Sequence, residues 1–428
     1  MSSDSDNAPS SSKRQAAERI VQRLHAAGHV AYFAGGCVRD HIMGREPTDY
    51  DVATDAPPQR VLELFRRSRK VGQAFGVVMV CAEGAWVEVA TFRTEWGYSD
   101  HRHPDHVQFS DAQHDALRRD FTINGLFYDP ASDQVIDYVG GQEDIRHRVV
   151  RAIGDPRQRF GEDYLRMLRA VRFAAKLSFT IDPATAQAIR EHAAELRGIS
   201  RERIGQEVRM MFEHPSRGRA ARLMEGLRLD GPALQEPHVD REPLALEGLE
   251  QEADFASALA AWAIDRHIEP HRPRHVRELM IALSRLKAVA VTQKWREALV
   301  LSNEETQAMA DALRTLPAAI DWPSLTIAQR KRLLARLDWP RIRRLLNAAQ
   351  RLLPEGSLSL AKLDAEARAL AGDGVAPSPL ITGDDLIAAG FEPGPRFRGV
   401  LDRVYDAQLE GAVTTRQGAV ELAKSMME

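Results

Sequence analysis

The signals for β-strands are confined to the first third of the chain, and this uneven distribution is the strongest constraint on its fold. Short runs of β-branched residues at 76–80 and 85–91, separated by Glu83-Gly84, predict a β-hairpin. Beyond Asp155, nearly every segment instead shows the apolar spacing of helices. Strands packed early and helices later predict an α+β fold, with a small mixed sheet in a head and an all-α remainder.

The length and composition narrow the class of protein. With 428 residues the chain is too long for one compact core, so several domains are expected. No apolar run approaches the ~18 residues that span a membrane, and the polar start MSSDSDNAPSSS predicts a disordered tail rather than a targeting signal. The two cysteines, Cys37 and Cys81, favour a reducing cytoplasm. A net charge of −3 does not by itself indicate nucleic-acid binding.

The segment AYFAGGCVRDHIMG, residues 31–44, has the features of a phosphate-binding turn. It predicts a short strand, a turn at Gly35-Gly36 and a short helix. The N–H groups at the N-terminus of such a helix form a ready site for an anion. Arg39 lies one turn into the helix, where its guanidinium group suits a phosphate.

Two aspartates, Asp49 and Asp51, follow this segment in a predicted strand, with Tyr50 between them. Residues two apart in a strand point to the same face, so the two carboxylates should converge. They repel each other unless a cation lies between them, and Mg²⁺ prefers such hard oxygen ligands. A metal pair beside a phosphate site predicts nucleotidyl or phosphoryl transfer. The alternative is that both aspartates cap a surface turn, because short motifs arise often by chance.

Glu88 lies between Val87 and Val89 in the second strand of the predicted hairpin. A carboxylate among valines either faces solvent from a half-exposed sheet or supplies a third metal ligand. Its position alone favours the solvated face.

Residues 162–173, EDYLRMLRAVRF, predict a helix with charged side chains at three-residue intervals: Asp163, Arg166, Arg169 and Arg172. Guanidinium groups suit phosphates or base acceptors, whereas a carboxylate can accept from an exocyclic amine. Asp163 with Arg166 could therefore recognise C and A, which both carry amino donors, and the later arginines could hold phosphates. The alternative is a solvated helix face.

Other motifs occur in a fixed order along the chain. Residues 111–128 predict a helix that carries RRDFTIN at 118–124, and the later motifs are EDYLR at 162–166, SRERIGQE at 200–207 and LITGDDL at 380–386. Together with GGCVRD and DYD, these motifs resemble those of the bacterial-type (class II) tRNA nucleotidyltransferases, the CCA-adding enzymes, and of the similar bacterial poly(A) polymerases. Their joint order is more specific than any one motif. One departure is Gly125, where the family usually has alanine; this small-for-small exchange should be tolerated.

The resemblance implies a polymerase β-like nucleotidyltransferase that adds CCA to the 3′ end of tRNA, using CTP, ATP and two Mg²⁺ ions. It implies that Asp49 and Asp51 hold the metals, with Glu88 as a further catalytic carboxylate. The residues implied to contact the nucleotide are Gly36, Arg39, Arg119, Asp163, Arg166, Arg169 and Arg172. Among these, Asp163 and Arg166 would select C and then A. The tRNA 3′-hydroxyl would attack the α-phosphate in line, and pyrophosphate would leave.

The resemblance also suggests a division into domains. We expect a disordered tail over 1–13, a catalytic head over 14–154, a helical neck over 155–215 for nucleotide selection, a helical body over 216–371, and a helical tail over 372–428 that binds tRNA. The loop GYSDHRHP, residues 97–104, would switch the enzyme from C to A addition, which argues against an enzyme that adds only CC.

Two alternative functions remain open. A poly(A) polymerase shares the head, although the segment VGQAFGVVMV at 71–80 and the loop at 97–104 look more like the CCA-adding branch. An RNA-binding module with a degenerate head would lack a metal ligand, and both aspartates are present. A dinucleotide-binding or P-loop protein is disfavoured, because neither glycine motif occurs where a strand meets a helix.

A basic cluster lies in two predicted helices that Pro340 separates. Its members are Arg330, Lys331, Arg332, Arg336, Arg341, Arg343, Arg344 and Arg351. The cluster either contacts the phosphates of tRNA or forms a solvated face. Arg330, Lys331, Arg343 and Arg344 are the residues we select as RNA-binding candidates.

Overall fold

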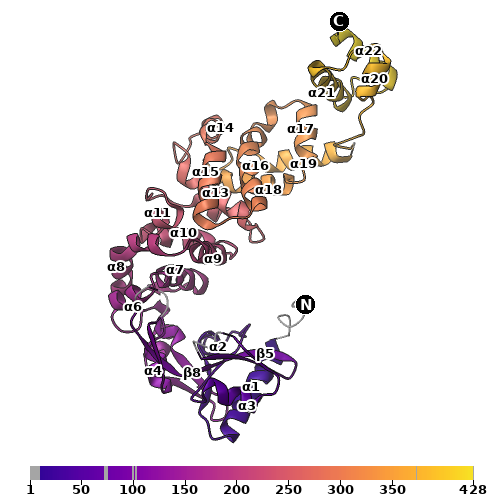
Figure 1. Cartoon of the computed structure of the whole chain (residues 1–428). Helices are drawn as coiled ribbons and strands as arrows, with labels where there is room; N and C mark the ends of the chain where they lie inside the picture. The colour runs from indigo at the N-terminus through magenta and orange to yellow at the C-terminus, as the bar shows by residue number, and fades with distance from the viewer. Residues whose placement is uncertain (1–9, 72–75, 99–100, 102–103, 373, 428) are drawn as a thin grey trace. The chain divides into compact units, whose positions relative to one another are not determined.

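The computed structural model of the chain describes residues 10–71, 76–98, 101, 104–372 and 374–427 (Figure 1). These residues form two compact units. One contains the chain up to Met211 together with 223–238, and the other contains 212–222 together with 239–428. Within the described ranges, no helix combines the length and the apolar character needed to cross a bilayer.

The first unit is built on a seven-stranded mixed sheet with the strand order β3-β4-β5-β2-β1-β8-β9. The strands are β1 (Ala31–Ala34), β2 (Asp51–Thr54), β3 (Ser68–Lys70), β4 (Val77–Ala82), β5 (Ala85–Thr91), β8 (Leu126–Asp129) and β9 (Gln134–Asp137). All neighbours pair antiparallel except β2 and β5, which are parallel. The sheet confirms the predicted α+β class.

The predicted β-hairpin is confirmed as β4 and β5. At its turn, Glu83 and Gly84 have φ angles of 45° and 78°, so both residues adopt the left-handed conformation that tight hairpin turns need. Because β5 also pairs with β2, Glu88 lies directly beside Asp51 in the sheet. The hairpin thus places the carboxylate of Glu88 next to that of Asp51.

Helices and short elements surround the sheet. They are α1 (Ser10–Ala26), α2 (Gly36–Ile42), α3 (Pro58–Leu64), α4 (Ala112–Leu117), η2 (Thr122–Asn124) and α5 (Gly141–His147), with a separate ribbon of β6 (Arg93–Trp96) and β7 (His106–Phe109). Helix α1 packs against β1, β2, β4 and β5 through an apolar stripe that includes Ala17, Ile20 and Leu24 (Figure 1).

The predicted disordered tail over 1–13 extends too far. Ser10–Lys13 belong to α1, because Ser10 Oγ donates to the Pro47 carbonyl and Lys13 Nζ to the Thr48 carbonyl. The polar, serine-rich sequence of this segment could not predict these hydrogen bonds, because their acceptors lie more than 30 residues away. Residues 1–9 lie outside the described part of the chain.

The helix predicted over 111–128 is also wrong. Helix α4 ends at Leu117, and the RRDFTIN motif is a loop that leads into η2 and β8. The carboxylate of Asp120 accepts the N–H of Phe121 at 2.8 Å and the amide of Asn124 at 3.1 Å. Such local side-chain bonds compete with the helical hydrogen bonds, and here they prevail.

Short helices complete the first unit. They are α6 (Pro156–Glu162), α7 (Leu165–Leu177), α8 (Pro183–His192), η3 (Ala193–Gly198), α9 (Arg201–Phe212), α10 (Arg217–Gly226) and α11 (Asp230–Leu234), where α10 begins in the second unit, and a two-stranded ribbon of β10 (Val149–Val150) and β11 (Thr180–Ile181) lies among them. The single helix predicted over 162–173 is broken at Asp163, which is extended with φ −153°. Its carboxylate accepts the N–H of Leu165 at 3.0 Å and so begins α7.

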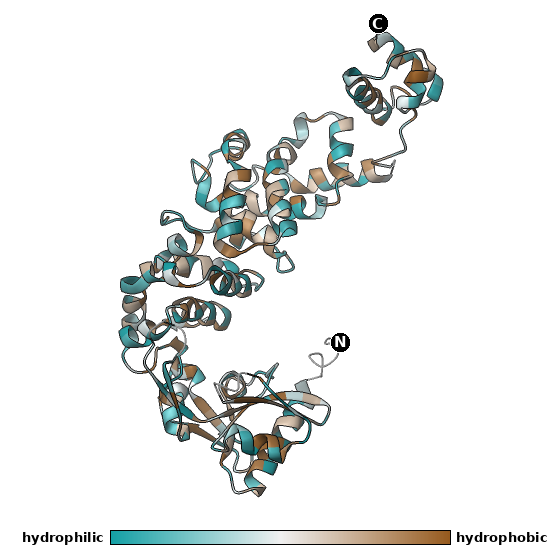
Figure 2. Ribbon diagram, viewed as in Figure 1, coloured by the Kyte–Doolittle hydropathy of each residue, from teal (hydrophilic) through white to brown (hydrophobic). Residues whose placement is uncertain are grey.

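The second unit is helical. Its helices are α12 (Leu244–Glu247), α13 (Phe255–His267), α14 (Val276–Arg285), α15 (Ala288–Leu299), α16 (Asn303–Ile320), η4 (Trp322–Ser324), α17 (Ile327–Leu334), α18 (Trp339–Gln350), α19 (Leu360–Gly372), α20 (Gly383–Ala388), α21 (Pro395–Leu409) and α22 (Arg416–Met427). Helix α13 is buried from Phe255 to Arg266, and Figure 2 shows hydrophobic residues along the inner helices of this unit. A separate apolar cluster that includes Leu386, Val404 and Ala419 holds α20 to α22 together.

Gly125 is packed more tightly than its sequence position suggested. A Cβ atom at this residue would lie 2.8 Å from Cγ2 of Val139 and 3.1 Å from Cδ1 of Ile153.

We therefore expect Gly125→Ala to lower the free energy of unfolding by about 1–2 kcal/mol, rather than to be neutral. Val139→Ala should relieve most of this cost, and the melting temperatures of the two single variants and the double variant measure the coupling. Additive effects of the two substitutions would contradict the proposed contact.

Candidate active site

A pocket of about 670 Å³ lies within the first unit, where the sheet, the RRDFTIN loop and α7 meet. Its lining includes every residue that the sequence predicted for metal or nucleotide binding: Gly36, Arg39, Asp49, Asp51, Glu88, Arg119, Asp163, Arg166, Arg169 and Arg172. The structure thus brings these residues together, and their individual roles stay predictions.

The carboxylates of Asp51, Asp49 and Glu88, which line the pocket, come from β2, from the loop before it and from β5, respectively. Strand β2 begins at Asp51, so Asp49 lies in the preceding loop. The prediction that the two aspartates share a strand is therefore wrong. Asp51 opens to the solvent of the pocket while protein surrounds its other sides. This burial, together with the negative charge of Glu88 and of Asp49, raises the pKa of Asp51 to about 6, although Arg119 acts in the opposite direction.

Lys13 holds the other aspartate. Its ammonium group lies 2.6 Å from Oδ1 of Asp49, whose side chain is 73% exposed. No sequence pattern indicates this contact, because Lys13 lies in a polar segment that is predicted to be disordered.

The donor chemistry of this site fits a hard cation. Asp51 resists ionisation because of its burial and, after that, the charges of Glu88 and Asp49, and a divalent cation would offset these effects. Within the described ranges, no three candidate ligands form a ready-made metal cage. A bound Mg²⁺ would therefore take only some of its ligands from the protein, as is usual for this ion.

The glycine turn and Arg39 form a stiff wall of the pocket. Gly35 has φ 75°, and a Cβ atom there would lie 3.1 Å from Nη1 of Arg119, so glycine lets this arginine approach the turn. Arg39 is buried and donates from Nη1 to Oδ1 of Asn124 at 2.8 Å. The guanidinium group predicted for phosphate binding is thus fixed by the protein rather than free in solvent.

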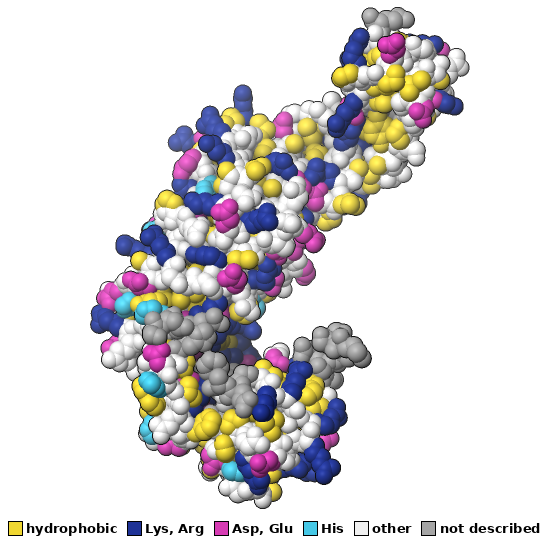
Figure 3. Space-filling model, in the orientation of Figure 1, with side chains coloured by type: hydrophobic (Ala, Val, Ile, Leu, Met, Phe, Trp, Pro, Cys, Tyr) yellow, Lys and Arg dark blue, Asp and Glu magenta, His cyan; other side chains and the backbone are white. Residues whose placement is uncertain are grey.

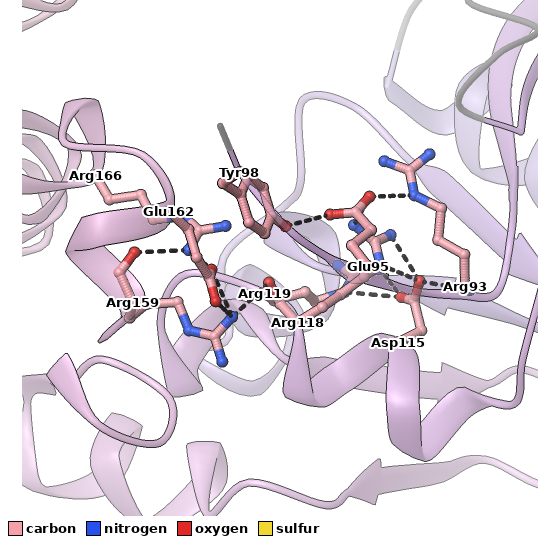
Figure 4. Close-up of polar contacts among 9 residues, drawn as sticks. All are labelled: Arg93, Glu95, Tyr98, Asp115, Arg118, Arg119, Arg159, Glu162 and Arg166. Carbon is pink, nitrogen blue, oxygen red and sulfur yellow. Dashed lines mark hydrogen bonds and ion pairs between the residues drawn. The ribbon is translucent and has the colours of Figure 1, made fainter. Parts of the chain in front are cut away.

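Arg118 and Arg119 are held by the buried Asp115. Its carboxylate lies 2.6 Å from Nη2 of Arg118 and 3.0 Å from Nη2 of Arg119 (Figure 4). Burial disfavours the negative charge of Asp115. The attraction of the two arginines is stronger than this effect and keeps the pKa of Asp115 below its usual value. Glu95 accepts from Arg118 and, at 2.9 Å, from the hydroxyl of Tyr98, so the network reaches the loop at 97–104.

Buried or half-buried carboxylates also orient the arginines of α7. Arg169 donates to Asp120 at 2.7 and 2.9 Å, and Arg172 donates to Glu207 at 2.7 Å. Burial disfavours the charge of Asp120, but Arg169 outweighs it and keeps its pKa below the usual value. The arginine stripe is therefore not a solvated helix face.

Asp163 and Arg166 have separate partners. Asp163 Oδ2 accepts from Arg203 at 2.7 Å, while Arg166 pairs with Glu162 and donates to the carbonyl of Arg159 at 2.8 Å (Figure 4). Sequence reasoning missed the roles of Arg203 and Glu207. Both lie in the SRERIGQE motif, whose resemblance to the family assigns neither residue a role.

The basic cluster lies in the second unit and is largely neutralised. Five of its arginines contact acidic partners, namely Arg330 with Glu366, Arg332 with Asp406, Arg336 with Asp338, Arg341 with Asp254, and Arg343 with Asp364. Of the candidates selected for RNA binding, Lys331 and Arg344 have no acidic partner among the described residues.

Two segments used to favour the CCA-adding branch are incompletely described. Residues 72–75 of the VGQAFGVVMV segment, and residues 99–100 and 102–103 of the loop, lie outside the described ranges. Beside them, His101 Nδ1 lies 2.6 Å from the carbonyl of Gly161, and its ring packs against Tyr164.

Comparison with known proteins agrees with this geometry. The poly A polymerase head domain matches residues 31–151, and a probable RNA and SrmB-binding site of polymerase A matches residues 178–235. The CCA-adding enzyme of Lacticaseibacillus paracasei is 33% identical over 409 residues, which cover 93% of both chains. The chain belongs to the CCA-adding enzyme family.

Other members of the family match over different lengths. The enzyme of Geobacillus sp. is 37% identical over 71% of this chain and 78% of its own. The chain spans about half the length of the Lactiplantibacillus plantarum enzyme, with 45% identity over 54% of that relative and 51% of this chain.

Solved structures of the family share the fold. The Bacillus stearothermophilus CCA-adding enzyme in complex with CTP has a TM-score of 0.72 and 27% identity, covering 96% of this chain and 97% of that one. The Thermotoga maritima CCA-adding enzyme complexed with tRNA has a TM-score of 0.63 at 18% identity, covering 96% and 94%, and supports the fold alone.

The raised pKa of Asp51 predicts a pH-dependent effect on stability. The folded protein binds this proton more tightly than the unfolded chain, so ionisation of Asp51 destabilises the fold as the pH rises from about 4 to above 6. Without divalent cations, Asp51→Asn should raise the melting temperature at pH 8 by about 1–2 °C and have little effect at pH 4.5.

Adding MgCl₂ provides the control for this prediction. The ion should stabilise the natural protein at pH 8 more than Asp51→Asn, since the variant has lost one carboxylate. A variant that melts at a lower temperature at pH 8 without the ion would contradict the repulsion among the carboxylates.

Proposed function

We propose that the protein is a nucleotidyltransferase that adds CCA to the 3′ end of tRNA from CTP and ATP, without a nucleic-acid template. The observation that carries this proposal is the single pocket that combines acidic metal donors, fixed arginines and the Asp163 carboxylate. Membership of the CCA-adding family supports it, as does the similarity to an enzyme whose structure contains CTP.

We infer that Asp49 and Asp51 bind two Mg²⁺ ions, with Glu88 beside them. When bound, such ions activate the attacking hydroxyl and stabilise charge on the triphosphate. Glu88 raises the pKa of Asp51 and so increases the gain when a cation binds there. We find no need for a covalent intermediate on the enzyme.

The arginines would divide the remaining work. Arg39 and Arg119 line the wall formed by the glycine turn and would bind the triphosphate, while Arg169 and Arg172 extend this positive surface along α7. Because carboxylates already fix these arginines, little conformational entropy would be lost when a nucleotide binds. Gly36 would let the phosphates approach the backbone.

The proposed domains follow the resemblance: head 14–154, neck 155–215, body 216–371 and tail 372–428. The helices and the apolar cluster of α20 to α22 support a separate tail. Cytoplasmic location stays a prediction, based on two cysteines that are both free and buried.

The direct test offers the purified protein a tRNA that lacks its 3′ end, with CTP and ATP separately and together. Extension by CCA alone is the expected result. Long A tails would identify a poly(A) polymerase, and no incorporation in the presence of Mg²⁺ would indicate a non-catalytic RNA-binding protein. The double variant Asp49→Ala/Asp51→Ala is the control and should incorporate no nucleotide.

Asp163→Ala should impair the choice between nucleotides more than the rate of transfer. Loss of one base-edge acceptor removes about 1–3 kcal/mol of discrimination, so the preference for CTP over UTP or GTP should fall about 10- to 100-fold. Single-nucleotide incorporation with each triphosphate measures this ratio.

Arg203→Met is the matched variant, because it frees Asp163 from its ion pair while keeping the carboxylate. It should weaken discrimination less than Asp163→Ala. If Asp163→Ala kept the full preference while activity collapsed, Asp163 would have only a structural role.

Arg343 and Arg344 should behave differently although they are adjacent. Arg343 forms two hydrogen bonds of 2.7 Å with Asp364, so Arg343→Gln should lower the melting temperature. Arg344→Gln should leave the melting temperature unchanged and weaken tRNA binding at low salt, as measured by fluorescence anisotropy. Unchanged affinity would remove Arg344 from the proposed tRNA contacts.

A further inference from the structure

A second groove, of about 790 Å³, lies on the head. Helix α1 contributes Arg19 and Arg23 to it, and the turn between α3 and β3 contributes Arg66 and Arg67. Glu83, at the turn of the β4–β5 hairpin, is the acidic residue of its lining. Judged by the residues that the structure describes, the linings of this groove and of the candidate active site have no member in common, so the two are separate sites.

The four arginines of this groove are exposed, and they outnumber the one acidic residue of its lining, Glu83. Some other exposed arginines of the head pair with neighbouring carboxylates, as Arg60 does with Glu63 at 3.1 Å. In the described ranges, none of the four groove arginines has an ion pair. In Figure 3, Lys and Arg side chains lie on the part of the head around α1 and α3, with some Asp and Glu side chains among them.

The arrangement of the arginines favours an extended anion. Arg19 and Arg23 are four residues apart on α1, so they project from the same side of the helix. The guanidinium group of Arg23 lies 5.2 Å from the ring centre of Phe65, which limits its movement. Arg66 and Arg67 approach from a different element, and the groove between them is far larger than one phosphate needs.

We propose that this groove binds the phosphate backbone of RNA. Guanidinium forks match phosphate oxygens, and several uncompensated arginines along one groove can follow successive phosphates. A protein partner is disfavoured because the large apolar side chain in the lining, Phe65, is itself buried, and protein interfaces need an apolar centre. The choice of RNA over other polyanions rests on the proposed function.

RNA in this groove would leave the catalytic pocket open. The groove would therefore add to the affinity for a long RNA and to its salt dependence, while the selection of nucleotides stays with the residues of the pocket. This separation gives the proposal its own readout.

The test uses the full chain with Arg19, Arg23, Arg66 and Arg67 all changed to Gln. Fluorescence anisotropy measures binding of a tRNA lacking CCA and of a 15-nucleotide oligouridylate between 50 and 300 mM KCl. At 50 mM KCl we expect at least a tenfold loss of affinity for one or both RNAs. The slope of log affinity against log salt should fall by about 2–4, because each lost phosphate contact contributes about 0.7–0.9.

Arg60→Gln is the matched control, since Arg60 is an exposed arginine of the neighbouring α3 that is already paired and does not line the groove. It should leave affinity and slope unchanged. Incorporation of CTP at saturating tRNA should persist in the fourfold variant, so failure of this proposal is distinguishable from failure of the proposed function.

Two results would overturn the proposal. One is an unchanged affinity and slope for both RNAs. The other is a groove that binds polyglutamate but no RNA, which would point to an acidic protein partner. If the fourfold variant does not fold by its melting curve, the pairs Arg19→Gln/Arg23→Gln and Arg66→Gln/Arg67→Gln are measured instead, and each should give about half of the slope change.

Discussion

A buried chain of hydrogen bonds through Asp120 determines the geometry of the pocket. The carboxylate of Asp120 accepts from Arg169 and from Asn124, and Asn124 in turn accepts from Arg39. The chain therefore links α2, beside the glycine turn, to α7, which carries the arginine stripe. An unpaired carboxylate at this depth would be costly, so each of these groups depends on the others for its position.

The pocket combines two opposite electrostatic arrangements. Around Asp120, Asp115 and Glu207, arginines stabilise each buried carboxylate, and their guanidinium groups are fixed as a result. Asp51 instead has Glu88 beside it, and its charge is opposed. The arginines of the pocket are thus already fixed by their partners, whereas the carboxylate of Asp51 would gain stability when a cation binds. This difference is what a site for a metal-bound triphosphate requires.

The sequence predicted the elements whose cause is local. The hairpin with Glu83-Gly84, and the set of residues that line the pocket, could be read from turn chemistry and from motif order. The breaks at Asp120 and Asp163 could not, because a carboxylate that competes for backbone N–H groups looks the same in sequence as one on a helix face. The partners of Arg169 and Arg172 are 49 and 35 residues away, so their pairing depends on the tertiary fold.

The sequence also cannot show which basic residues are neutralised, because their acidic partners are often distant along the chain. The arginines around Arg343 are close together in the sequence, yet partners such as Asp254, 87 residues from Arg341, neutralise most of them. Arg19 and Arg23 on α1, and Arg66 and Arg67 in the turn before β3, come from two separate segments and form no visible pattern in the sequence. The fold places them around one groove, whose lining has Glu83 as its acidic residue, and none of the four forms an ion pair with a described residue. Because like charges in one groove repel each other, the groove is where an added polyanion gains most, and the number of arginines per segment is a poor guide to such a surface.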